Sequence, residues 1–161
     1  MLGYYNNEKE TNGALHIHDD GNVWLHSGDL GVMDKNGFIK YTGRLKRLIV
    51  TSGYNVYPVQ IEEVLEKHPA VMLSSVVGIP HPYKQEVPKA FIVLNKGYRE
   101  TEELVKELKE LCSKNLPRYA KVYEYEFRKS LPRTMVGKVD FRKLQEENNK
   151  LRREERGEEK I

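Results

Sequence analysis

Two short apolar runs constrain the fold more than any other feature of the sequence. Residues 71–79 read VMLSSVVGI and residues 89–95 read KAFIVLN, and the segment between them is rich in proline. Each run has the length of a strand, and the Val, Ile and Phe residues in them are enriched in strands. The sequence therefore predicts that both runs are strands of one small sheet.

Segments on both sides of these runs supply further strands and two helices. RLIVTSGYNVYP gives two short β-rich stretches around Ser52 and Gly53, and Pro58 then opens a segment whose apolar residues share one helical face. Residues 101–114 repeat apolar side chains at helical spacing, whereas residues 121–127 alternate as a strand does. This order predicts an α+β domain, with helices packed on a small mixed sheet.

The first 44 residues are rich in turns and predict small antiparallel hairpins. Asp-Gly and Asn-Gly pairs separate short apolar stretches such as 23–25 and 38–41. Hairpins of this size are not stable alone, so we expect residues 1–44 to be the last hairpin segment of a larger amino-terminal domain. Residues 45–145 then form a second domain, and residues 146–161 form a charged tail that frays from the end of a helix.

Composition excludes several classes of protein. Of the 161 residues, 32% are charged and 39% are hydrophobic, values typical of a globular protein. No apolar run approaches the roughly 18 residues of a membrane helix, and the amino terminus has no signal-peptide pattern, so we expect a cytoplasmic protein. Basic and acidic residues are interleaved and the net charge is only +3, which argues against a nucleic-acid partner.

The cysteine and histidine content predicts no metal centre. Cys112 lies among the apolar positions of the second predicted helix, which favours a reduced core thiol over a nucleophile. His16 and His18 alternate in a strand-like stretch and could hold a metal, but no third ligand lies nearby in the sequence. We therefore expect surface or half-buried histidines.

Lys138 stands in a segment with an unusual composition. LPRTMVGKVDF, residues 131–141, places a proline and a glycine five residues apart, which is typical of a turn or loop. A lysine on such a loop is a flexible point charge suited to phosphate or carboxylate oxygens. Taken alone, the segment fits a solvated surface lysine equally well.

Five motifs occur along the chain in a fixed order. They are GYYNN (3–7), WLHSGDLG (24–31), GRLKRLIVTSGYNVYPVQIEEVL (43–65), VVGIPHPYKQEVPKAFIV (76–93) and LPRTMVGK (131–138). In this order they resemble the carboxy-terminal part of AMP-forming acyl-CoA synthetases, a superfamily that also contains peptide-synthetase adenylation domains and luciferases. The resemblance covers residues 3–145.

The resemblance implies an enzyme that activates a carboxylic acid with ATP to an acyl-adenylate and then transfers the acyl group to CoA. It makes Lys138 the catalytic lysine, which lies between the carboxylate and the α-phosphate and offsets their repulsion. It places Asp29 at the ribose hydroxyls and Arg44 near ribose and phosphate. A turn aspartate and a surface ion pair would explain these two residues as well.

Further residues follow from the same resemblance. Lys46 falls at the hinge between two domains, where changeable backbone angles matter more than side-chain chemistry. Ser52, Gly53 and Tyr54 match a turn that faces the pantetheine of CoA, although an ordinary hairpin glycine would look the same. Asn55 stands where short-chain acid synthetases carry arginine, which points to a medium-chain, long-chain or aryl acid. Glu86 and the preceding Gln85, which replaces a usual glycine, are expected to be structural.

The resemblance also implies ligands and partners. ATP, AMP and CoA would bind, with Mg²⁺ brought by ATP and held by no residue of this chain. The phosphate loop and acid pocket are absent, so we expect an amino-terminal domain of the same enzyme as partner and little activity without it. Weak affinity for the nucleotide end of CoA is expected from the basic residues around Arg44 and Arg47.

Alternatives remain open from the sequence. The chain could be a free-standing noncatalytic module that binds CoA or a protein, or the end of a peptide-synthetase adenylation domain. An RNA-binding domain is disfavoured because Glu124 and Glu126 oppose the aromatic residues of the alternating segment. A homodimer of the fragment, formed through residues 1–44, is a further possibility.

Overall fold

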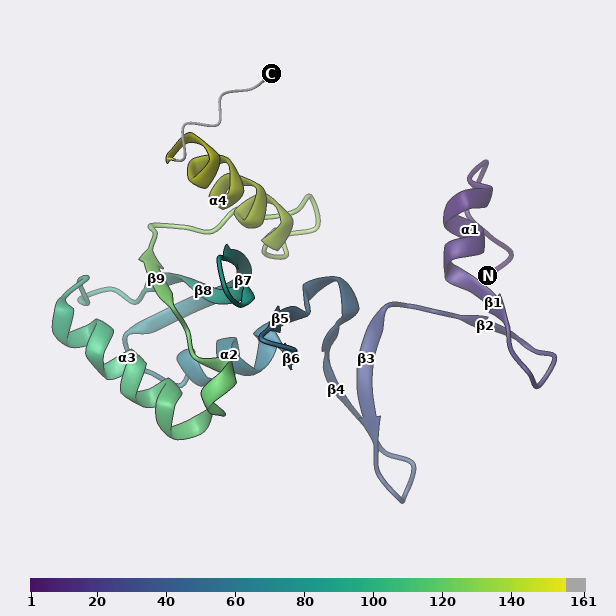
Figure 1. The fold of residues 1–161 in the computed structure, drawn as a ribbon, viewed down its shortest axis with the longest axis horizontal. Coiled ribbons are helices and arrows are strands. Elements are labelled where there is room, and N and C mark those ends of the chain that lie inside the picture. The colour runs from purple at the N-terminus through teal and green to yellow at the C-terminus, as the bar shows by residue number, and fades with distance from the viewer. Residues whose placement is uncertain (156–161) are drawn as a thin grey trace. The chain divides into compact units, whose positions relative to one another are not determined.

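A computed structural model describes residues 1–155, and the chain divides into two compact units, residues 1–46 and residues 47 onward. Figure 1 shows the elements of both units, coloured by residue number, and each unit is described by itself. A short 3₁₀ turn, η1 (Leu45–Arg47), spans the point at which the chain passes from one to the other.

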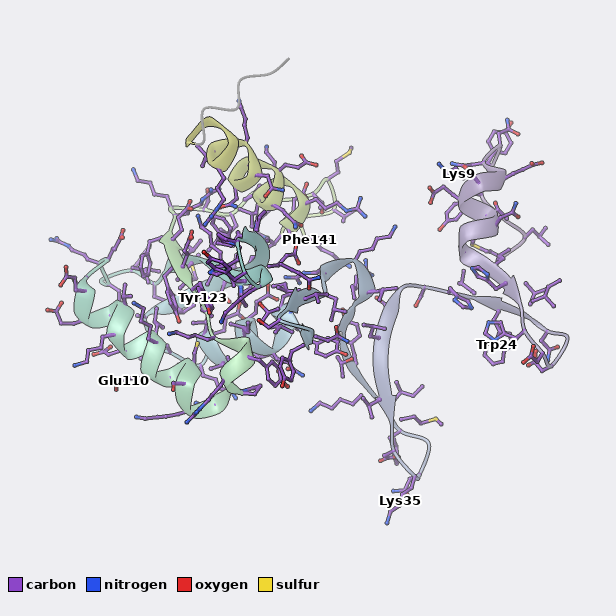
Figure 2. All side chains as sticks on the ribbon, in the orientation of Figure 1. Lys9, Trp24, Lys35, Glu110, Tyr123 and Phe141 are labelled. Carbon is purple, nitrogen blue, oxygen red and sulfur yellow. The ribbon has the colours of Figure 1, made fainter. Side chains whose placement is uncertain are left out.

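The first unit contains the two predicted hairpins. Strand β1 (Leu15–Ile17) pairs with β2 (Val23–Leu25), and β3 (Asp29–Met33) pairs with β4 (Ile39–Arg44), both antiparallel. Figure 2 shows Lys35 at the tip of the second hairpin. Most apolar side chains of these strands are exposed, including Ile17 at 77% and Ile39 at 74%. The hairpins therefore lack a core of their own.

A helix in this unit was missed by the sequence prediction. Helix α1 (Glu8–Ala14) begins after Asn7, whose side-chain oxygen accepts a hydrogen bond from the Glu10 amide at 3.1 Å. Two glutamates lie in its first turn, where their negative charge interacts favourably with the positive end of the helix dipole. The asparagine cap and these acidic residues were the available signals, but the turn-rich composition concealed them.

The second unit is built on the sheet that the sequence predicted. Its strands are β5 (Ile49–Thr51), β6 (Tyr54–Val56), β7 (Val71–His81), β8 (Gln85–Leu94) and β9 (Glu124–Phe127). The order β6-β5-β8-β7 is antiparallel throughout, and β9 adds to β8 in parallel. Because one pair is parallel, the sheet is mixed, and the predicted fold class is confirmed.

Helices cover both faces of this sheet. Ala90 and Ile92 of β8 face a core that includes residues of α2 (Pro58–Leu65) and α3 (Glu102–Asn115). The alternate residues Phe91 and Val93 face a second core, to which α4 (Phe141–Glu155) contributes Leu144. Figure 1 shows the strands between α4 and the pair formed by α2 and α3. A strand covered on both faces reads as a continuous apolar run.

The helix boundaries follow ordinary capping rules. Pro58 occupies the first turn of α2, where its missing N–H costs nothing, and the Thr101 hydroxyl accepts a hydrogen bond from the Leu104 amide at 3.1 Å at the start of α3. Both helices lie where the sequence predicted them. Cys112 is a free, buried thiol on the inner face of α3, as expected.

The carboxyl-terminal segment differs from the expected frayed tail. Helix α4 continues to Glu155, well past residue 146, because its inner face stays in contact with the sheet. Asn148 is 2% exposed and accepts a hydrogen bond from the Lys89 ammonium at 3.0 Å. Fraying was expected because this segment has few apolar residues. Instead, polar contacts such as that between Asn148 and Lys89 hold α4 against the sheet. Residues 156–161 of the predicted tail lie outside the described residues.

Replacing Leu108 by Ala tests the core between α3 and the sheet. Leu108 is fully buried, so its truncation leaves a cavity, and the free energy of unfolding should fall by about 2–5 kcal/mol in urea titrations. Lys106→Ala on the exposed side of the same helix is the control and should change stability by less than about 0.5 kcal/mol. Equal losses in the two variants would contradict the packing described here.

Candidate functional site

Lys138 lies on a small hairpin that is closed by backbone hydrogen bonds between its two arms. The Thr134 amide donates to the Lys138 carbonyl at 2.7 Å, and Arg133 and Val139 form a β-bridge. Gly137 has a φ of +81°, which the tight turn requires and other residues rarely adopt. The Arg133 guanidinium donates to the Gly137 carbonyl at 2.7 Å. The predicted turn is therefore present, and these bonds hold it in a defined form.

The ammonium of Lys138 is free to meet a ligand. Lys138 is exposed, and its side chain makes no ion pair or hydrogen bond with any residue that the structure describes. Its neighbours at the hairpin tip, Met135 and Val136, are 107% and 80% exposed. An exposed apolar tip beside an unpaired cation suits insertion into a site formed by another part of a protein.

The two ends of this hairpin are fixed in the second core. Leu131 precedes it and Leu144 follows it, and both belong to the apolar cluster against β7 and β8. Phe141 is the first residue of α4, and the Arg47 guanidinium carbon lies 5.0 Å from its ring centre. Figure 2 labels Phe141 at the start of α4. The sheet thereby determines where Lys138 is presented.

An ion-pair network holds α4 against the sheet. Arg128 donates to Glu126 of β9 at 2.6 Å and to Glu147 of α4 at 2.7 Å, and Lys89 lies 2.9 Å from Glu126. Arg152 of α4 also pairs with Glu124. Burial by itself raises the pKa of Glu126, but hydrogen bonds from Lys89 and Arg128 outweigh it and hold the pKa below its usual value.

The pKa of Glu126 predicts a pH-dependent contribution to stability. A carboxylate with a depressed pKa stabilises the fold above its unfolded pKa of about 4.3, and this stabilisation is lost as the pH falls through the lower folded value. The unfolding free energies of the wild type and Glu126→Gln should therefore differ more at pH 7 than at pH 3. Urea titrations at the two pH values measure both gaps.

Glu110→Gln is the control for this experiment. Glu110 is an exposed carboxylate of α3, labelled in Figure 2, and its substitution reports the general effect of losing a surface charge. A gap between wild type and Glu126→Gln that is equal at both pH values would contradict the network.

The turn of Ser52 and Gly53 joins β5 to β6. Both residues have positive φ, +48° and +82°, as a two-residue type I′ hairpin requires. The Ser52 amide donates to the Lys84 carbonyl at 3.1 Å, and the Thr51 hydroxyl donates to the Glu86 carbonyl. A Cβ at Gly53 would meet no atom within 4 Å, so the backbone is open to a ligand there.

Gln85 and Glu86 have structural roles, as expected. Gln85 pairs with Thr51 and has a φ of +66°. Glycine adopts this backbone conformation more easily than other residues, and the family pattern usually has a glycine at this position. The Glu86 carboxylate lies against Gly78, where an added Cβ would come within 2.9 Å of it. These contacts leave Glu86 facing its own sheet.

Asp29 and Arg44 lie together in the first unit, at the end of the β3–β4 hairpin. They are paired residues of the two strands, and the Arg44 Nε atom lies 2.8 Å from Asp29 Oδ1. The side chains of Asp29 and Arg44 are 41% and 57% exposed, so both remain accessible to a ligand. A carboxylate acceptor beside a guanidinium donor fits a ribose hydroxyl next to a phosphate.

Other predicted residues have different environments. Lys46 is the last residue of the first unit. Arg47 donates to Glu62 and, at 3.3 Å, to the Val76 carbonyl, so part of its guanidinium is engaged inside the unit. The expected weak affinity for the nucleotide end of CoA stays a prediction. Burial raises the pKa of the Cys112 thiol, which disfavours a thiolate.

The histidines form a small cluster that the sequence did not reveal in full. His18 Nε2 lies 2.7 Å from His26 Nε2, and the rings of His16 and His26 are 4.3 Å apart. Within residues 1–155, no group of three or more histidine, cysteine or acidic side chains is arranged to hold a metal. None of the helices described is both long and apolar enough to cross a membrane.

The structure thus defines an α+β domain with helices on both faces of its sheet, which presents an unpaired lysine on a closed hairpin and an open glycine turn. Comparison with known proteins agrees with this class. The family model described as "AMP-binding enzyme C-terminal domain" matches residues 60–138. Residues 60–138 thus match this family, and the resemblance that the ordered motifs indicated is confirmed.

Its relatives are ligases. The chain is 43% identical over 147 residues to a long-chain-fatty-acid–CoA ligase of Bacillus subtilis, covering 91% of this chain and 25% of that protein. It is 38% identical over 151 residues to a ligase of the same name from Yersinia pestis, covering 94% and 25%. The chain therefore spans about a quarter of the length of these relatives.

Solved structures give the same result. The anthranilate CoA ligase AuaEII in complex with anthranoyl-AMP is 30% identical with a TM-score of 0.80, and covers 90% of this chain and 27% of that one. The o-succinylbenzoate CoA synthetase of Bacillus subtilis, in complex with its acyl-adenylate, is 32% identical with a TM-score of 0.78, over 90% and 28%.

Proposed function

We propose that this chain is the carboxy-terminal part of an AMP-forming acid–CoA ligase that acts on a medium- or long-chain fatty acid or an aryl acid. One observation carries the proposal. Lys138 is an unpaired cation on a pinned hairpin, in a chain whose alignment with a long-chain-fatty-acid–CoA ligase covers 91% of its residues. Asn55, where short-chain enzymes carry arginine, supports the choice of acid.

The role of Lys138 follows from electrostatics. When a carboxylate attacks the α-phosphate of ATP, two anionic groups approach each other, and pyrophosphate leaves as the acyl-adenylate forms. An ammonium placed between them lowers the barrier, because a preorganised charge is strong in a site that excludes water. The exposed Lys138 has no partner among the described residues to compete with these oxygens.

Asp29 and Arg44 have supporting roles in nucleotide binding. The exposed Asp29 carboxylate accepts ribose hydroxyls, and the Arg44 guanidinium, with Nε 2.8 Å from Asp29 Oδ1, approaches ribose and phosphate. Mg²⁺ enters with ATP and takes no ligand from this chain. Ser52, Gly53 and Tyr54 line the path of the pantetheine thiol in the second step.

A larger amino-terminal domain is the proposed partner. The exposed apolar side chains of β1 to β4 need a covering surface, since hairpins without a core are not stable alone. Lys46 is then the hinge, because it ends the first unit. By itself the chain has little or no ligase activity. A cytoplasmic location remains a prediction.

Replacing Lys138 by Ala in the full-length ligase tests the central claim. Loss of the cation should lower the rate of acyl-adenylate formation by at least about 100-fold, because one preorganised charge-stabilising group contributes that much. Thioester formation from supplied acyl-adenylate should be unchanged. Pyrophosphate exchange and CoA-thioester assays measure the two steps.

Lys129→Ala is the matched control for Lys138→Ala. Lys129 is likewise exposed and lies a few residues upstream, so both steps should run at the wild-type rate in that variant. An equal loss of both steps in Lys138→Ala, or no loss of the first, would rule out the proposed role.

Asp29→Ala tests the nucleotide site. Removing the acceptor of the ribose hydroxyls should raise the KM for ATP about 10- to 100-fold, in line with the loss of charge-assisted hydrogen bonds. The KM for the acid should stay constant. Asp19→Ala, at an exposed turn of the first unit, should leave both values unchanged. A change confined to the acid KM would refute the assignment.

A further inference from the structure

Tyr119 stacks on Tyr54, a contact that no local sequence pattern indicated. The two rings are 4.7 Å apart between centres and only 5° from parallel. Tyr54 begins β6, directly after the open Gly53 turn, whereas Tyr119 lies on the 3₁₀ turn η2 (Arg118–Ala120), which follows α3. The contact therefore joins the candidate thiol-binding turn to a segment far away in the sequence.

Tyr54 has little other support for its ring. Its side chain is 56% exposed and makes no hydrogen bond with a residue in the described part of the chain. Among the strands described, β6 pairs with β5 alone, so it is an edge of the sheet. Without a stacking partner, the ring of an edge tyrosine would sample several rotamers.

Tyr119, in contrast, stands on a fixed base. Ala120 is 3% exposed, and its amide donates to the Pro117 carbonyl at 2.9 Å. Val122 is 2% exposed, and the next amide, that of Tyr123, donates to the Pro88 carbonyl at 2.9 Å. These contacts attach η2 and the residues after it to the core and to β8, so Tyr119 can hold a mobile ring in place.

We propose that Tyr119 is a positioning residue for the thiol half-reaction: its ring fixes that of Tyr54 and so keeps the Ser52–Tyr54 turn shaped for the pantetheine arm of CoA. The inference rests on the proposed function for its ligand, but the stack itself is independent of it. The open face of Gly53 and the fixed Tyr54 ring together form one wall of the path for the thiol.

Nuclear magnetic resonance of the 161-residue chain tests the stack. Parallel rings at 4.7 Å shift each other's ring protons upfield, so the Tyr54 signals should be shifted in the wild type and in Tyr119→Phe. The upfield shift should disappear in Tyr119→Ala. Tyr54 signals that are identical in wild type and Tyr119→Ala would overturn the inference, whatever the enzymatic result.

Kinetics of the full-length ligase test the positioning role. Tyr119→Ala should raise the KM for CoA about three- to tenfold, the range that corresponds to one aromatic pair, while the rate of adenylate formation stays constant. Tyr119→Phe should restore the wild-type KM. Tyr54→Ala should raise the KM similarly, and the double variant Tyr54→Ala/Tyr119→Ala should be no worse than either single variant, because Tyr119 acts through Tyr54.

Tyr98→Ala is the control, since Tyr98 is an exposed tyrosine of the same unit with no ring partner among the described residues. A ligase with an unaltered KM for CoA in Tyr119→Ala, or one that loses adenylate formation equally, would overturn the positioning role alone. A wild-type enzyme that makes no acyl-CoA would overturn the proposed function, and the resonance experiment would still decide whether the stack exists.

Discussion

The antiparallel pair of β7 and β8 is the constraint on which the second unit depends. The two strands pair along nearly their whole length, and alternate residues of β8 enter two different cores. Helices α2 and α3 pack on one core and α4 on the other. Because both faces are buried, the register cannot slip without moving apolar side chains out of one core and into the other. Every candidate functional segment of this unit is attached to this pair.

Attachment to this strand pair explains why two exposed segments, the Ser52–Tyr54 turn and the Lys138 hairpin, have defined conformations. The Ser52 turn is bonded to the turn between β7 and β8 through the Lys84 carbonyl, and Tyr119 supports it from η2. The Lys138 hairpin is held between Leu131 and Leu144 of the second core. A rigid sheet that carries functional residues on its loops is a common arrangement. Since the hairpin is closed by backbone hydrogen bonds, a displacement of Lys138 would require the whole unit to move rather than the loop alone.

Several site features lay beyond sequence reasoning for a physical reason. The Tyr54–Tyr119 stack joins residues 65 positions apart along the chain, and the pairing of Arg47 with Glu62 depends on how α2 meets the sheet. Helix α4 was predicted too short because its apolar residues are few. The Lys89, Arg128 and Glu126 network that anchors it exists only once β8, β9 and α4 are assembled.

Local sequence signals specify most strands and helices of the second unit and their order along the chain. Strand-length apolar runs, the proline at the start of α2, the threonine cap of α3 and the glycine turns are local signals, and each produced the predicted element. The ordered motifs also singled out Lys138, Asp29 and Arg44. Which charges find partners depends on the folded arrangement: Arg47 pairs with Glu62, whereas Lys138 has no partner among the described residues. Such pairing depends on side chains that come together only when the chain folds, so local sequence patterns cannot predict it.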